Sequence, residues 1–126
     1  MSSLTPQRRA ILYVEDAITY SKRAIEFLGG QSDDQLEQDL KGQFAIFRAI
    51  EVVGEAARNI PEEVRALSTD IPWSDVIAMR NRIAHHYFGV RLDVVINVVR
   101  LDLPPLIVSL EHLLLDLKRS QEQDAE

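Results

Sequence analysis

Apolar residues recur at every third or fourth position along most of this chain, which is the spacing of one face of an α-helix. The first such run covers residues 11–28. It follows Thr5-Pro6, a pair typical of a helix start because the hydroxyl caps free backbone N–H groups and proline suits the first turn. Gly29-Gly30 predicts the end of this helix. No stretch of the sequence alternates convincingly as a β-strand, so the pattern predicts helix as the main secondary structure.

A second long helix is predicted from about Asp39 to Arg58, with apolar residues three or four positions apart along its inner side. Gly54 falls on the same side, although glycine inside a helix costs about 1 kcal/mol relative to alanine. We therefore expect a neighbouring helix to approach closely at Gly54. The inner residues are Leu40, Phe44, Phe47, Ile50, Val53 and Ala57.

Shorter helical segments are predicted on both sides of this helix. The sequence from Ser32 to Gln35 resembles a capping box, and Pro61 suits the first turn of another short helix. A longer helix follows the turn at Pro72-Trp73 and carries apolar residues until Phe88-Gly89 breaks or bends it.

The last long helical region is predicted from about Leu92 to Arg119, with an interruption at Leu103-Pro104-Pro105. The prolines lack N–H donors and disfavour helical dihedral angles at Leu103, so we expect a kink or restart there. Residues 121–126 form a polar tail that we expect to fray. Four main helices plus short helices predict an all-α, up-and-down helical bundle in a single domain over residues 1–126.

Composition narrows the class of protein. The 126 residues can bury a core without disulfides, and the absence of cysteine excludes thiolate nucleophiles and cysteine-based zinc sites. The formal net charge of −6 argues against a protein that coats nucleic acid, because such binding uses a basic surface to neutralise many phosphates. Charges interrupt every apolar stretch, so we expect no signal peptide, no transmembrane helix, no membrane partner and a cytoplasmic protein.

Side chains able to carry chemistry concentrate in one segment, residues 79–90. An arginine fork binds phosphate oxygens and stays charged at working pH, whereas histidine exchanges protons near neutrality. A phosphate clamp beside a proton carrier is what cleavage of a phosphodiester requires in the absence of a metal or cofactor. We therefore expect the functional site in this segment, which contains Arg80, Asn81, Arg82, His85, His86 and Tyr87.

Helical geometry limits how these side chains cooperate. Asn81 and His85 are four residues apart and lie within about 40° of each other on one face. Arg80 and His85 are about 140° apart. One helix therefore does not aim both at one phosphate unless the arginine reaches round or the helix ends near His85. A second copy of the segment, related by a twofold axis, removes this difficulty.

The spacing of Arg80, His85 and Tyr87 resembles the R-x4-H-x-Y motif of the HepT-like toxins, which belong to the HEPN superfamily of helical ribonucleases. The similarity covers most of the chain, and the order and spacing of its segments make it fairly specific. The other segments that carry it are 13–16, 51–57, 71–73 and 102–106.

This resemblance implies a HEPN-like fold and a homodimer whose two motifs face each other across a cleft. It also implies metal-independent cleavage of RNA after attack by a 2′-hydroxyl. In this interpretation His85 transfers the proton and Arg80 stabilises the charge of the transition state. Asn81 orients the imidazole or holds a phosphate oxygen.

The resemblance also implies a regulatory partner. Tyr87 matches the position that an MNT-type nucleotidyltransferase antitoxin modifies with AMP, and a phosphate added beside Arg80 competes for its guanidinium. Family members often carry an acid where this chain has His86. Arg82, Arg91 and His86 are candidates for contact with RNA. The implied function is an endoribonuclease toxin of a toxin–antitoxin pair.

Simpler interpretations remain open. His85 is alternatively a helix-terminal histidine bonded to a carbonyl, and Tyr87 a core aromatic. Arg82 and Arg91 are alternatively solvated surface charges. The alternative function is a non-catalytic helical subunit that binds a nucleotide, or a structural partner of a nucleotidyltransferase.

Glu51 and Glu55 lie one turn apart and suggest a carboxylate-bridged metal pair. No Glu-x-x-His pair accompanies them anywhere in the sequence, so this interpretation is disfavoured. Glu55 is instead a candidate partner for an arginine near the cleft.

Overall fold

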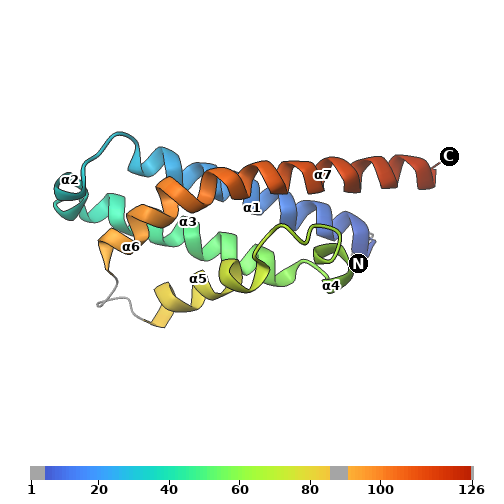
Figure 1. Ribbon diagram of the computed structural model, residues 1–126, viewed down its shortest axis with the longest axis horizontal. Helices are drawn as coiled ribbons and strands as arrows, with labels where there is room; N and C mark the ends of the chain where they lie inside the picture. The colour runs from blue at the N-terminus through green and yellow to red at the C-terminus, as the bar shows by residue number, and fades with distance from the viewer. Residues whose placement is uncertain (1–4, 86–90, 126) are drawn as a thin grey trace.

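The computed structural model describes residues 5–85 and 91–125, which form a bundle of antiparallel helices (Figure 1). Within these ranges there is no β-strand, so the predicted all-α fold with four main helices is confirmed. None of these helices combines the length and apolarity that a membrane crossing needs. The elements in chain order are α1 (Pro6–Leu28), α2 (Asp33–Glu37), α3 (Leu40–Asn59), α4 (Glu62–Arg65), α5 (Trp73–His85), α6 (Leu92–Asn97), the π-helical segment η1 (Val98–Asp102) and α7 (Leu103–Ala125).

Local hydrogen bonds set the ends of the first helices where the sequence predicts them. Thr5 Oγ1 accepts a hydrogen bond from the backbone N–H of Arg8 at 3.1 Å. Gly29 ends α1 with a φ of 54°, a conformation that glycine adopts without a steric penalty. Ser32 and Gln35 form the predicted capping box, because each side chain accepts a hydrogen bond from the other residue's backbone N–H, at 3.2 Å and 2.8 Å.

The core is built around α1, which runs beside both α3 and α7 (Figure 1), and buried residues of α5 and α6 complete it. The predicted inner side of α3 is correct from Phe47 onward. It is wrong for Leu40 and Phe44, whose side chains are 62% and 42% exposed. Phe44 lies about 180° around the helix from buried Val53, so both cannot face one core. The largest fully buried side chains include Leu36, Ile46, Ile50, Leu103, Leu110 and Leu113.

The interruption predicted at the two prolines takes a different form. Leu103 keeps helical dihedral angles, with φ −69° and ψ −40°, so the expected departure at this residue is wrong. The adjustment occurs one turn earlier, in η1, where the N–H of Leu103 donates to the carbonyl of Val98. This wider turn relieves the clash between each proline ring and the preceding carbonyls. The helix therefore continues through Pro104 and Pro105 and ends at Ala125, beyond the expected end near Arg119.

Helix α5 packs mainly against α3 (Figure 1). Gly54 of α3 is buried at this contact, and a Cβ atom built on it would overlap the Cβ of Arg80. The same added atom would stand 3.2 Å from the backbone nitrogen of Arg80 and 3.2 Å from the carbonyl oxygen of Val76. The close approach predicted at Gly54 is thus confirmed. This contact sets how closely α3 approaches Arg80, the first residue of the motif.

Candidate active site

Arg80 lies in the second half of α5, with 36% of its side chain exposed. Its Nε lies 3.7 Å from Oε1 of Glu55 in α3, which makes an ion pair rather than a hydrogen bond. Its Nη1 donates to Oδ1 of Asn81 at 3.3 Å. Glu55 is therefore the arginine partner that the sequence indicated. Among the side chains that the structure describes, Nη2 of Arg80 makes no hydrogen bond, which leaves its N–H donors to an anion.

Glu55 belongs to a short ionic network on α3. Nη1 of Arg48 lies 3.5 Å from Oε2 of Glu51 and 3.5 Å from Oε1 of Glu55. The spacing of these three residues places them along one side of α3, which is why they meet. Together with Arg80 the network holds two carboxylates and two guanidinium groups, so its formal charges balance.

Arg80 and Asn81 line one cavity of about 370 Å³ between α3 and α5. This volume lies in the range of sites for small ligands. Arg58 adds a second guanidinium to the lining, and Asn59 a second amide. Motif analysis missed Arg58 and Asn59; the available signal was that they follow Glu55 by three and four residues and so share its side of α3. The remaining lining residues are Gly54, Glu55 and Ile77.

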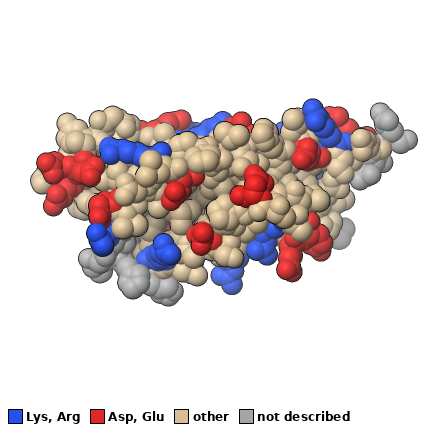
Figure 2. Space-filling view, in the orientation of Figure 1, with Lys and Arg blue, Asp and Glu red and all other residues tan. Residues whose placement is uncertain are grey.

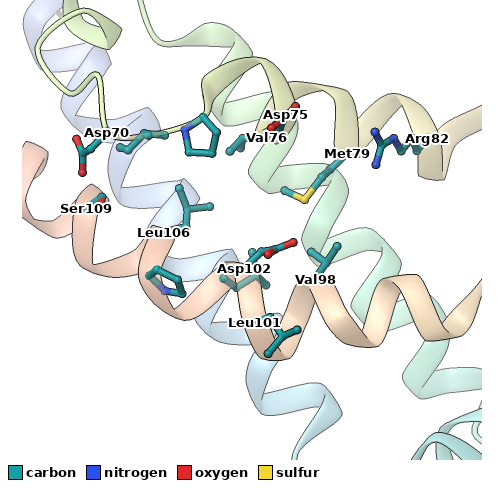
Figure 3. A pocket seen from close by; sticks show the side chains of 14 residues that line it. Asp70, Asp75, Val76, Met79, Arg82, Val98, Leu101, Asp102, Leu106 and Ser109 are labelled. Atoms are coloured by element: carbon teal, nitrogen blue, oxygen red, sulfur yellow. The ribbon is translucent and has the colours of Figure 1, made fainter.

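Arg82 lies in a different cavity. This second cavity, of about 450 Å³, lies between α5 and the chain from η1 into α7 (Figure 3). Asp75 and Met79 line it together with Arg82 from α5, and Asp102 lines it from η1. Buried apolar side chains contribute to the lining. The structure therefore does not bring Arg82 together with Arg80, although only Asn81 separates them in the sequence.

Arg91 precedes α6 and is paired with an acid. Its Nε and Nη2 donate to the two carboxylate oxygens of Asp93 at 3.2 Å and 2.7 Å. These hydrogen bonds lower the pKa of Asp93 below its usual range. Arg91 is exposed, but any RNA phosphate must compete with this carboxylate.

The histidines and the tyrosine of the motif cannot be placed in the same way. His85 is the last residue of α5, and its side chain lies outside what the structure describes, as do His86 and Tyr87 altogether. The predicted roles of these three residues are therefore not tested by the geometry. Elsewhere in residues 5–85 and 91–125, no three His, Asp or Glu side chains are grouped as a metal site needs.

The surface charge is consistent with local contacts to an anion. Figure 2 shows acidic and basic side chains interspersed over the visible face, in keeping with the formal net charge of −6. An extended polyanion is not held by such a mixed surface through charge alone. Recognition of such a polyanion therefore requires specific sites, such as the cavity beside Arg80.

Residues 17–113 match the family described as Ribonuclease HepT-like. The chain belongs to this family. It is 32% identical over 114 residues to "Putative RNase MJ0127" of Methanocaldococcus jannaschii, covering 90% of this chain and 93% of that protein. It is 37% identical over 101 residues to "Probable ribonuclease HepT" of Thermococcus cleftensis, covering 80% and 92%. No solved structure matches the chain.

These findings confirm the family that the motif predicted, and the chain is an endoribonuclease by membership of the HepT-like family. The matched range includes all of α3 and α5, and therefore the whole lining of the cavity beside Arg80.

Proposed function

We propose that this protein is the toxin of a cytoplasmic toxin–antitoxin pair, a metal-independent endoribonuclease that cleaves RNA through its 2′-hydroxyl. The observation that carries the proposal is that Arg80 and Asn81, the first two residues of the motif, line one cavity together with Arg58. Two guanidinium groups, two amides and one carboxylate line this cavity, and a lining of this kind and size suits a phosphate and the sugar attached to it. Membership of a ribonuclease family supports RNA as the substrate.

In the proposed reaction the 2′-hydroxyl loses its proton, and its oxygen bonds to the adjacent phosphorus. The bond from phosphorus to the 5′-oxygen then breaks, and that oxygen takes up a proton. The products are a 2′,3′-cyclic phosphate and a 5′-hydroxyl. His85 transfers the proton, a role typically worth 10²–10⁴-fold in rate, and Arg80 stabilises the negative charge that builds on the phosphoryl oxygens.

Asn81 is proposed to support both Arg80 and His85. Its amide oxygen accepts a hydrogen bond from Arg80, and its position in α5 is on the same face as His85. Arg82 and Arg91 are proposed to contact RNA at a distance from the scissile phosphate, because neither lines the cavity beside Arg80. His86 is proposed as a third contact with RNA.

We propose that the working enzyme is a homodimer. Helical spacing separates positions 80 and 85 by about 140° around α5, so a twofold partner supplies the second half of each site. The MNT-type nucleotidyltransferase antitoxin inactivates this dimer by adding AMP to Tyr87. The added phosphate occupies the guanidinium that the substrate needs.

The test is cleavage of a defined RNA by the purified protein in excess chelator. Arg80→Ala and His85→Ala should each lose most of the activity while circular dichroism shows that they remain helical. Mapping of the fragment ends should give 2′,3′-cyclic phosphates and 5′-hydroxyls. Equal activity in the wild type and both variants identifies a contaminating nuclease, and fragments with 5′-phosphates exclude the 2′-hydroxyl mechanism.

A further inference from the structure

We infer that Glu55 is a positioning residue for Arg80, an inference that rests on the proposed ribonuclease function. Glu55 holds one edge of the guanidinium group so that the terminal nitrogen Nη2 stays available to the phosphate. It acts on the reaction through Arg80 and does not itself touch the substrate.

The contacts of Arg80 involve two of its three guanidinium nitrogens, Nε and Nη1. Glu55 lies 3.7 Å from Nε, and Asn81 accepts from Nη1 at 3.3 Å. Nη2 makes no hydrogen bond among the side chains that the structure describes. The negative charge that builds on the phosphoryl oxygens in the transition state therefore meets, at Nη2, a guanidinium whose other two nitrogens already have partners, so the group need not reorient during the reaction.

The carboxylate of Glu55 is itself held in place. Its Oε1 lies 3.5 Å from Nη1 of Arg48, on the preceding turns of the same helix, as well as near Arg80. One oxygen thus pairs with two guanidinium groups. Arg48 also pairs with Glu51, which keeps the Arg48 side chain along α3.

Two consecutive residues of α3 fix the two ends of the Arg80 side chain. Gly54 admits the Cβ of Arg80 by having no side chain of its own. Glu55, the next residue, pairs with Nε at the far end. Gly54 and Glu55 therefore position both ends of the Arg80 side chain, its Cβ and its guanidinium group.

A purely structural role for this ion pair predicts a different outcome. The side chains of Arg80 and Glu55 are 36% and 39% exposed, and pairs between such exposed charges contribute little to the stability of a fold. If Glu55 served mainly to stabilise the bundle, its loss would therefore be nearly silent. If it competed with RNA for Arg80, its loss would lower KM. Positioning instead predicts a fall in kcat with KM almost unchanged.

The experiment compares Glu55→Gln with Glu51→Gln in steady-state cleavage of one RNA. Glu51 is the matched control, because it is one turn away and pairs with Arg48 but not with Arg80. For Glu55→Gln we expect kcat to fall by about tenfold and KM to stay within about twofold; for Glu51→Gln both should stay within about twofold. Glu55→Asp provides a second variant, since its shorter side chain keeps the charge but does not reach Nε, and the same fall is expected.

A double variant tests whether the effect passes through Arg80. Lysine has a single ammonium group and no Nε edge to hold. In an Arg80→Lys background, Glu55→Gln should therefore change kcat by less than about twofold, and a full tenfold loss there overturns the inference. An active wild type whose Glu55→Gln variant keeps its kcat, or only lowers KM, overturns it too. A wild type that cleaves no RNA instead overturns the proposed function.

Discussion

The two faces of α5 carry two arginines that are neighbours in the motif but have different surroundings. On one face, Arg80 packs its base against Gly54 and pairs its tip with Glu55. On the other face, Arg82 stands at the edge of a cavity lined largely by apolar side chains (Figure 3). The comparison teaches that membership in a short motif does not imply membership in one site. The packing of α5 on α3 places Arg80, and not Arg82, against Gly54 and Glu55.

The largest expected effect separates the two arginines directly. Arg80→Ala should reduce kcat/KM for RNA by about 10²–10³-fold, the usual result of removing one donor that stabilises transition-state charge. Arg82→Ala is the matched control, because it removes the same side chain two residues away and should change kcat/KM by less than about fivefold. Parallel cleavage assays in chelator make the measurement. Equal losses in the two variants would show that both faces serve the same phosphate.

The next effect concerns the stability of the fold around the cavity that contains Arg82. Leu103 is fully buried and lines the cavity that contains Arg82. Leu103→Ala should lower the free energy of unfolding by about 2–5 kcal/mol, because it leaves a void in packed surroundings. Well below the melting temperature, the folded variant should keep its kcat. Chemical denaturation and a cleavage assay on one preparation test both points, and a large fall in kcat would tie this face to the chemistry.

A smaller effect is expected from a substitution at Gly54, which should change both stability and activity on the face of α5 that carries Arg80. Gly54→Ala gains about 1 kcal/mol of helix propensity, but the new methyl group overlaps the Cβ and backbone of Arg80, which cannot rotate away. Overpacking of this kind costs about 1–3 kcal/mol, so the variant should be slightly less stable and should lose activity as Arg80 moves. Gly30→Ala is the control, because nothing lies within 4 Å of its added Cβ. Both variants can be compared by melting temperature and kcat.

The smallest expected effect is a dependence of the stability of the fold on pH, through a carboxylate near the cavity that contains Arg82. Hydrogen bonds from Ser109 and then Ser68 hold the pKa of Asp70 below its usual range. A lowered pKa in the folded state means that the stabilisation is present above the unfolded value of about 3.9 and is lost as pH falls through the folded value. Asp70→Asn should therefore flatten the fall in melting temperature below about pH 4. An unchanged slope would exclude this carboxylate as a contributor.

Sequence alone predicted what depends on neighbouring residues in the chain. Thr5 and Ser32 cap helices through contacts within one turn, and such contacts are visible in a few letters. Phe44 was misplaced because apolar spacing shows a stripe but not which part of it meets the core. Leu103 was misjudged because the prolines act on an earlier turn, which can widen instead of ending.

The candidate site was predictable only in part. The motif identified Arg80 and Asn81, and the spacing of Gly54 within its helix indicated a close neighbour. That this neighbour is Arg80 depends on the register of α5 against α3, which no local pattern encodes. The same register brings Arg58 to the cavity, and so it was missed.

The wide turn of η1 makes the length of the chain before the prolines critical. A turn closed by a hydrogen bond from Leu103 to Val98 contains one residue more than a regular helix would use. Deleting a single residue from 98–102 would restore regular winding and leave the following helix in nearly the same phase, because the wide turn closed from Leu103 to Val98 would become a regular one. Leu106 and Leu110 then keep their places in the core, but both proline rings meet carbonyls with no room to yield. A lost codon at this point is therefore expected to be more damaging than most substitutions there.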